Sequence, residues 1–350
     1  MVENKKIKVA VLMGGASSER EISLSTGKQV FNALDRNKYE VVAIDAGSLE
    51  GSTLRYDKQA NVKIDAVEAA KKELEDTIKL ESFNSILTLD KKKRPDVVFI
   101  ALHGKYGEDG CVQGFLELMG LKYTGSGVLA SSLAMDKSQT KKMLSASGIR
   151  VIPSVDFTYK NYESLDKIIP EIEKLEFPVI IKPSRQGSTI GMLKVSSKDM
   201  LKESIVESAR YDRQIVVEKF IEGCELTVSV MGNDSPYALP VVEIVPKSGF
   251  YDYHAKYTPG ATDEIVPARI SDEQTRLAQK TAIDSYKAIG CKGYARVDII
   301  MDNDSNMNVL EINTIPGMTP TSLLPRAAQA AGKDFVDLLD EIISYALEEV

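Results

Sequence analysis

Short apolar runs, separated by glycine turns and amphipathic stretches, dominate the pattern of the chain. The first run, residues 7–13, breaks at two glycines, and the pattern that follows predicts a helix to about residue 34 with Ser17 or Ser18 as its N-cap. Strand, glycine turn and helix in this order open an α/β unit. Further buried strands are expected at residues 39–45, 96–102, 177–182, 192–195, 214–221 and 224–231.

The remaining pattern mixes helices with strands. Helices are expected at residues 128–148 and 271–289 and from residue 335, and strands at about 241–245 and 263–266. The aromatic and polar residues 250–261 suit a lid that folds over a ligand. The lysine-rich residues 47–94, with a helix expected at about 65–80, are interpreted as a peripheral elaboration of the first domain whose role is not predicted.

The most informative pattern lies in residues 293–319, which predict two strands flanking a polar turn. A hairpin centred on that turn places Asp298 opposite Glu311 and Arg296 opposite Asn313, with opposed Cβ atoms roughly 5 Å apart. Two opposed carboxylates repel, so we expect a cation between them. Magnesium fits, because it binds carboxylates together with substrate phosphates. Asn313 would add an amide oxygen as a ligand, and Arg296 would add positive charge for an anion. The alternative is a solvated face of an edge hairpin without function.

Two further candidates belong to the N-terminal part. His103, one of only two histidines, follows the strand at 96–102 on a glycine-rich loop, where ligands collect in open α/β sheets. A structural role remains the alternative for this histidine. Glu19 falls in the first turn of the first helix, where complementing the helix dipole is the simpler interpretation. A dinucleotide fold would need Gly-x-Gly-x-x-Gly here, and only the two adjacent glycines are present.

The middle of the chain offers a nucleotide-like pattern. A buried strand delivers Lys182 to a loop rich in glycine and serine that could wrap its N–H groups around phosphates. A hairpin turn that needs glycine explains the same loop, and no Walker A motif is present. Another strand ends in Glu218 and Lys219 and continues into Phe220 and Ile221, which could offer a backbone edge and a flat contact to a purine.

Composition and charge narrow the class of protein. The chain has 350 residues, which predicts two or three domains, and its net charge of −7 argues against non-specific binding to nucleic acid or anionic membranes. The three cysteines have no metal-like spacing and are interpreted as packing residues in a reducing compartment. No signal peptide and no apolar run of about 18 residues is present, so we expect a cytoplasmic protein without a membrane span.

Together these features resemble the ATP-grasp superfamily and, within it, the D-alanine:D-alanine ligases. The resemblance covers nearly the whole chain outside residues 47–94. It is carried by Gly14-Gly-Ala-Ser-Ser-Glu-Arg-Glu-Ile-Ser, Ala101-Leu-His-Gly, Gly107-Glu-Asp-Gly, Tyr123-Thr-Gly-Ser-Gly, Met135-Asp-Lys, Lys182-Pro-Ser-Arg, Tyr251-Asp-Tyr, Ala255-Lys-Tyr and Glu311-Ile-Asn-Thr-Ile-Pro-Gly-Met-Thr.

The resemblance implies the architecture and the oligomer. The expected class is α/β, with α+β character in the C-terminal half: an ATP-grasp fold preceded by a Rossmann-like N-terminal domain. The expected domains are an N-terminal domain at 1–125, a central lid domain at 126–221 and a C-terminal domain with the metal and substrate sites at 222–350. A homodimer is also implied.

The resemblance also implies a role for each site residue. For ATP, it implies phosphate contacts from Lys137 and Lys182, and an adenine and ribose border of Glu218, Lys219, Ile221 and Glu225. For metal, it implies two Mg²⁺ or Mn²⁺ ions per active site, held by Asp298, Glu311 and Asn313. For the first D-alanine, it implies that Glu19 binds the ammonium and is linked through Ser188 to Tyr257 on the lid. For the oxyanion hole, it implies Arg296 and the Gly317 N–H. For the second D-alanine, it implies Ser322 and Leu323, and His103 is a further substrate-binding residue.

The implied reaction joins two D-alanine molecules through a D-alanyl phosphate, with release of ADP and phosphate, for the synthesis of peptidoglycan precursors. Tyr257 goes with dipeptide formation in the family, whereas His254 stands where many relatives carry a carboxylate, so its role in the lid is open. The base for the second amine is not predicted. The alternatives are a D-alanine:D-lactate or D-alanine:D-serine ligase, or a non-catalytic ATP-binding regulator on the same fold.

Overall fold

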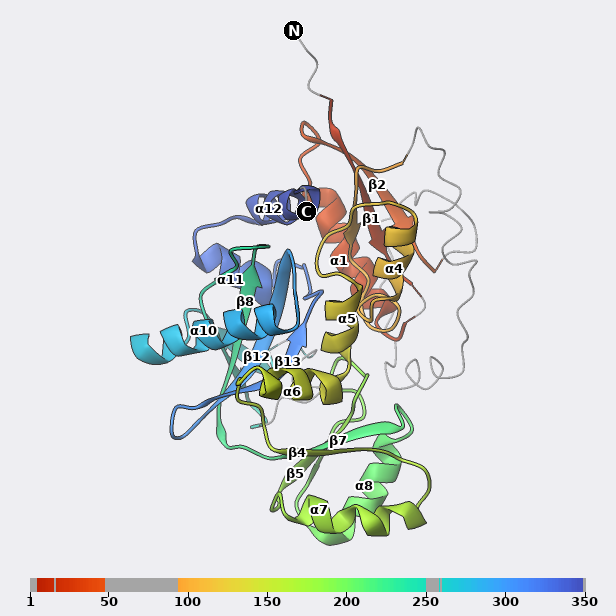
Figure 1. Ribbon diagram of the computed structural model, residues 1–350. Coiled ribbons are helices and arrows are strands. Elements are labelled where there is room, and N and C mark those ends of the chain that lie inside the picture. The colour runs from red at the N-terminus through yellow and green to blue at the C-terminus, as the bar shows by residue number, and fades with distance from the viewer. Residues whose placement is uncertain (1–4, 16, 48–93, 250–257, 259, 349–350) are drawn as a thin grey trace.

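The computed structural model describes residues 5–15, 17–47, 94–249, 258 and 260–348 (Figure 1). Its strands form three sheets that follow one another along the chain. The helix predicted at about 65–80, most of the predicted lid, and with it Tyr257 and His254, lie outside the described residues. No helix among the described residues has the length and apolar character to cross a membrane.

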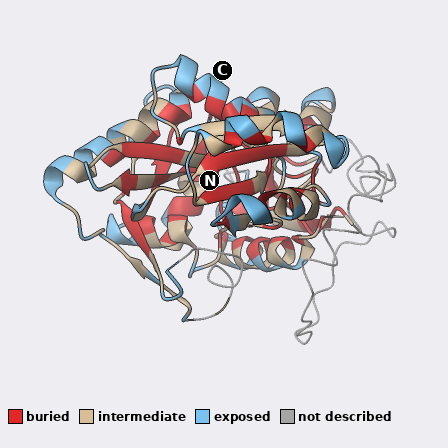
Figure 2. Cartoon of the chain, turned by 90° about the horizontal axis from the view of Figure 1, so that it is seen from below, coloured by how far each residue is buried: buried red, intermediate tan, exposed pale blue. Residues whose placement is uncertain are grey.

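The first sheet is parallel, with β1 (Ile7–Met13) between β2 (Tyr39–Asp45) and β3 (Val97–Ile100). Side chains of β1 alternate between two cores. One core is shared with α1 (Arg20–Ala33) and α12 (Phe335–Leu347), and the other with α4 (Cys111–Leu118). The alternation explains why β1 is apolar from Val9 to Met13, since both faces are covered there. Figure 2 shows such buried residues along the strands and exposed residues on the outer helices.

The predicted start of α1 was wrong. Its N-cap is Glu19, whose side chain makes no capping hydrogen bond. The hydroxyl of Ser17 instead donates to the main-chain oxygen of His103 at 2.6 Å and so ties two loops at the sheet edge together. The same hydroxyl accepts a hydrogen bond from the Glu19 N–H at 3.2 Å, before the helix begins, so Ser17 supports the approach to α1 but is not its N-cap.

The second sheet is antiparallel, in the order β4 (Ser154–Thr158), β7 (Gln214–Lys219), β5 (Val179–Pro183) and β6 (Leu193–Val195). Helices α7 (Ile169–Glu173) and α8 (Leu201–Ser208) pack with one of its faces around an apolar core. Val179 and Ile181 point into that core. Lys182 alternates with them and therefore reaches the opposite face, which lines a cavity.

The third sheet is antiparallel, in the order β11 (Thr262–Ile265), β10 (Val242–Pro246), β8 (Gly223–Met231), β12 (Tyr294–Asp302) and β13 (Met307–Asn313), with β9 (Tyr237–Ala238) paired to β8. Helix α10 (Asp272–Ala288), which begins at a capping box of Ser271 and Gln274, covers one face. The predicted hairpin register is confirmed: Asp298 pairs with Glu311 and Arg296 with Asn313.

The single helix predicted at residues 128–148 is in fact two, α5 (Val128–Met135) and α6 (Lys137–Ala146). Asp136 between them is extended, and its side chain accepts a hydrogen bond from the Gln139 N–H as the N-cap of α6. The same carboxylate accepts from the hydroxyl of Ser184 at 2.7 Å, just after β5. The break therefore places Lys137 at a helix start beside the second sheet. The predicted domain boundaries, after residues 125 and 221, stay predictions.

Candidate active site

Two cavities, of about 740 and 470 Å³, lie beside the third sheet, and both are lined by Lys137 and Glu311. The larger lies between the second and third sheets, and the smaller between the hairpin and the loops of the first sheet. Every described member of the predicted site lines one of them. The larger takes Lys182, Glu218, Lys219, Ile221, Glu225 and Asp298. The smaller takes Glu19, His103, Ser188, Arg296, Asn313, Gly317, Ser322 and Leu323.

One wall of the larger cavity carries a buried charge cluster. Glu218 on β7 is only 1% exposed, and its carboxylate pairs with the Nζ atoms of Lys182 at 2.7 Å and Lys141 at 2.8 Å. Burial alone would raise the pKa of Glu218, but the two ammonium groups hold that pKa at about 2. Burial likewise opposes the charge of Lys182, yet Glu218 keeps the pKa of this lysine raised. Sequence reasoning missed Lys141, although it stands one helical turn after Lys137.

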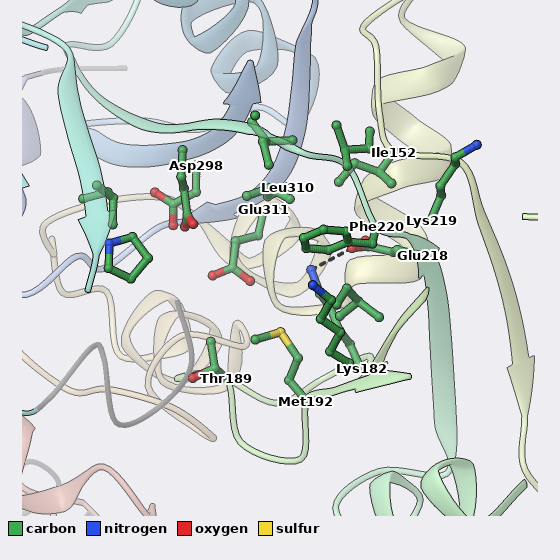
Figure 3. A pocket seen from close by; sticks show the side chains of 18 of the residues that line it. Ile152, Lys182, Thr189, Met192, Glu218, Lys219, Phe220, Asp298, Leu310 and Glu311 are labelled. Atoms are coloured by element: carbon green, nitrogen blue, oxygen red, sulfur yellow. Dashed lines mark ion pairs between the residues drawn. The ribbon is translucent and has the colours of Figure 1, made fainter. Parts of the chain in front are cut away.

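Figure 3 shows the Lys182–Glu218 pair towards one end of the cavity, Asp298 towards the other, and Glu311 between Asp298 and the pair. Phe220 lies beside the Lys182–Glu218 pair, and its ring centroid is 3.5 Å from the Lys194 ammonium. The flat contact predicted from the strand end is therefore part of the cavity wall. A flat apolar surface beside buried polar groups is the usual composition of a site for a planar ring.

At the other end, each hairpin carboxylate has a cationic partner from the chain. Arg296 donates two hydrogen bonds of 2.8 Å to Asp298, which also accepts from the Thr227 hydroxyl at 2.5 Å. Glu311 pairs with Lys137 at 3.2 Å, and its side chain remains 31% exposed. Both carboxylates therefore pair with protein cations, and the predicted metal site stays a prediction. Among the described residues, no group of three or more His, Cys, Asp or Glu is placed to hold a metal ion.

In the smaller cavity, Glu19 accepts a hydrogen bond from the Ser188 hydroxyl, although Glu19 precedes α1 beside the first sheet and Ser188 lies in the loop between β5 and β6 of the second. Ser188 and Thr189 have φ angles of +53° and +57°, a strained conformation for residues with side chains. A Cβ at Gly104 or Gly187 would lie 2.8 or 3.1 Å from the Glu19 carboxylate. Two loops therefore enclose this carboxylate, which does more than complement the dipole of α1.

His103 stands at the rear of the smaller cavity with a contact at each ring nitrogen. Its Nε2 is 3.0 Å from the Thr26 hydroxyl, and its Nδ1 is 3.7 Å from a Glu108 carboxylate oxygen. The other oxygen of Glu108 accepts from the Gly104 N–H at 2.8 Å. Sequence reasoning missed Thr26 and Glu108 as partners, although Glu108 lies within the Gly107-Glu-Asp-Gly motif.

The far end of the smaller cavity is built by the loop after β13 and by α11 (Leu323–Ala330). Ser322 precedes this helix, and its hydroxyl accepts from the Thr319 N–H at 3.1 Å. A Cβ at Gly317 would lie 2.8 Å from that hydroxyl, so glycine is the residue that fits. The loop brings the Gly317 main chain to the same cavity as the buried Arg296.

Comparison with known proteins shows the family to which the chain belongs. A family model described as D-ala D-ala ligase N-terminus matches residues 8–126, and one described as D-ala D-ala ligase C-terminus matches residues 143–344. The chain belongs to the D-alanine–D-alanine ligase family. Members of this family are ADP-forming ligases with an ATP-grasp fold, and the three-sheet arrangement agrees with that class. The predicted fold class is confirmed.

Members of the family resemble the chain over its full length. The D-alanine–D-alanine ligase of Carboxydothermus hydrogenoformans is 46% identical over 344 residues, covering 98% of this chain and 99% of the relative. A crystal structure of the ligase from Bacillus anthracis complexed with ATP has a TM-score of 0.72 and 33% identity, with 97% of each chain covered. The VanG D-Ala:D-Ser ligase from Enterococcus faecalis has a TM-score of 0.76 and 32% identity, covering 98% of this chain and 100% of that one.

Proposed function

We propose that the chain joins two molecules of D-alanine to D-alanyl-D-alanine, with conversion of ATP to ADP and phosphate, for peptidoglycan precursor synthesis. The observation that carries the proposal is the meeting of two cavities at Lys137 and Glu311, one with an apolar and cationic wall and one with polar groups for a small amino acid. Full-length similarity to D-alanine–D-alanine ligases supports it. Because the reaction consumes ATP, we place it in the cytoplasm, and we propose a homodimer, to be tested by mass measurement in solution.

ATP would occupy the larger cavity. The phosphates would contact Lys137 and Lys182, whose positive charges suit a polyanion. The adenine and ribose would lie along Glu218, Lys219, Ile221 and Glu225, next to the apolar side chains already described. This orientation directs the γ-phosphate to the border that the two cavities share.

Asp298, Glu311 and Asn313 suit two Mg²⁺ or Mn²⁺ ions as an oxygen donor set, because hard cations prefer carboxylate and amide oxygens together with phosphate. The register pairs the two carboxylates across β12 and β13, and Glu311 is open to the cavity. Asn313 Oδ1 accepts from the Ile315 N–H at 3.0 Å and retains a second lone pair. Bound metal would neutralise charge on the phosphates during phosphoryl transfer.

The first D-alanine would bind through its ammonium to Glu19, which Ser188 orients, with His103 beside it. A carboxylate is a poor electrophile, so its oxygen first attacks the γ-phosphorus, and ADP leaves. The acyl phosphate so formed has phosphate as a leaving group. Tyr257 on the lid belongs to the same proposal, since a closed site protects the acyl phosphate from water.

The second D-alanine would lie against Ser322 and Leu323 and attack as a free amine. Its nitrogen forms a bond to the acyl carbon, and the carbonyl oxygen becomes an oxyanion. The nitrogen gives up a proton, which the departing phosphate can accept, and the oxyanion collapses as the carbon–oxygen bond to phosphate breaks. Arg296 and the Gly317 N–H would stabilise the oxyanion. Loss of one such donor typically costs about a hundredfold in rate.

The test is ADP release measured with D-alanine, L-alanine, D-serine and D-lactate, together with identification of the product. ADP release that requires D-alanine and yields only the dipeptide supports the proposal. Mixed products with D-serine would favour the second candidate function, a D-alanine:D-serine ligase, which the similarity to the VanG D-Ala:D-Ser ligase supports. Products with D-lactate would favour a D-alanine:D-lactate ligase. ATP binding without ADP release under any of these conditions would indicate a regulator and contradict a ligase.

A further inference from the structure

Lys141 carries one of the most enclosed charges in the described part of the chain. It lies on α6 one turn after Lys137, and its side chain is 6% exposed. Its ammonium contacts a carboxylate oxygen of Glu218 at 2.8 Å and the main-chain oxygen of Ile152 at 3.2 Å. Lys182, from β5, contacts the other Glu218 oxygen at 2.7 Å. The carboxylate is therefore held between lysines from two different elements.

The two lysines differ in what else they can reach. Lys182 and Glu218 line the larger cavity, whereas Lys141 is not part of its lining. Lys141 therefore approaches Glu218 from behind the wall. A ligand in the cavity contacts Lys182 and Glu218 but acts on Lys141 only through Glu218.

The charge of the cluster explains why a second lysine is useful. With both lysines protonated, one carboxylate and two ammonium groups give a net charge of about +1 in a region where burial makes each charge strongly felt. Burial lowers the pKa of Lys141, and its contact with Glu218 counteracts this lowering. Without Lys141, Glu218 and Lys182 would neutralise each other, and the cavity wall would carry no net charge there. With Lys141, the positive charge of Lys182 remains available to the cavity. The other charged side chains that line the cavity stay the same in either case: Lys137, Lys194, Lys219, Glu222, Glu225, Glu243, Asp298 and Glu311.

We propose that Lys141 is a positioning residue for nucleotide binding: it neutralises Glu218 from outside the cavity, so that the Lys182 ammonium can bind an electron-rich or anionic atom of the nucleotide. This inference rests on the proposed binding of ATP in the larger cavity. It assigns Lys141 no contact with the ligand.

The test is direct ATP binding by calorimetry, without turnover, in Lys141→Met. We expect ATP affinity to fall about tenfold, equivalent to about 1.4 kcal/mol, while the KM for D-alanine changes less than twofold. Lys141→Arg keeps the charge and should retain most of the affinity. The matched control is Lys142→Met, because Lys142 is the next residue, is 56% exposed and pairs with Asp156 at the surface. It should bind ATP like the original chain.

A second variant separates a charge effect from a folding defect. If Lys141 acts by neutralising Glu218, then adding Lys141→Met to Glu218→Gln should weaken ATP binding less than threefold, since no carboxylate remains to be neutralised. Equal losses in both backgrounds, or equal losses for ATP and D-alanine, would overturn the inference. If the unmodified chain bound no ATP, the proposed function itself would fail. If the unmodified chain bound ATP and Lys141→Met bound it equally well, only the inference about Lys141 would fail.

Discussion

The larger cavity has carboxylates at both ends, and they are held in different ways. Glu218 is enclosed, with a lysine on each oxygen. Glu311 at the other end is 31% exposed and pairs with Lys137 at the longer distance of 3.2 Å. A buried charge that is fully paired is costly to disturb, whereas a partly exposed pair contributes little to stability and exchanges partners readily. The enclosed end therefore belongs to the framework of the site, and the open end is where a new cation can enter.

The largest expected effect is on folding and concerns the enclosed end. Glu218→Leu would leave two buried lysines without a counter-charge, and we expect a loss of about 3–5 kcal/mol in the free energy of unfolding. Glu311→Gln should lose less than about 1 kcal/mol, because Glu311 is 31% exposed and Lys137 keeps the main-chain oxygen of Gln186 as a hydrogen-bond acceptor. Urea unfolding of both variants measures the difference. Similar losses would mean that the two ends do not differ in the way described.

Acid should reveal the same contrast. The pKa of Glu218 is lowered from 4.5 to about 2 in the folded chain, since its lysine partners outweigh the effect of burial. The stability that this carboxylate contributes is fully present above pH 4.5 and is lost as the pH falls towards 2. The stability advantage of the original chain over Glu218→Leu should therefore shrink across this range. An advantage that stays constant with pH would contradict the assignment.

At the open end the expected effect is on catalysis. Glu311→Gln should lower the rate of phosphate release at least about a hundredfold, because a neutral amide binds a divalent cation poorly. Circular dichroism should show an unchanged fold. The check is phosphate release at saturating ATP and D-alanine. Unchanged turnover would contradict the assignment of this carboxylate to metal.

The smallest expected effect belongs to the second cavity. His103→Ala should raise the KM for D-alanine about tenfold, equivalent to about 1.4 kcal/mol, and leave ATP affinity nearly unchanged, because His103 lines only the smaller cavity. Steady-state kinetics with each substrate varied in turn gives both values. An equal loss of affinity for D-alanine and for ATP would contradict the assignment of the two substrates to different cavities.

Local patterns predicted the hairpin correctly, and long-range contacts explain what was missed. The register of Asp298 and Glu311 follows from strand alternation and one polar turn, which are both local in sequence. The N-cap of α1 was predicted one or two residues too early, because the Ser17 hydroxyl accepts from the Glu19 N–H before the helix and donates to the distant main-chain oxygen of His103. The helix break at Asp136 did carry a local signal, since aspartate before a helical pattern is a common N-cap.

The site residues also fall into those that the sequence indicated and those that it did not. The described residues that the resemblance named line the two cavities, and their individual roles stay predictions. Lys141, Thr26 and Glu108 were missed because each matters through a partner on another element, which composition and spacing do not reveal.

The contact between Glu19 and Ser188 has a consequence for building hybrids of related proteins. Glu19 belongs to the part of the chain matched by the N-terminal family model, and Ser188 and Gly187 to the part matched by the C-terminal one. Exchanging one part for that of a relative would preserve each sheet and still alter this junction. If Glu19 binds D-alanine as proposed, a working chimera must keep a small residue opposite the carboxylate and a hydroxyl within hydrogen-bond distance of it.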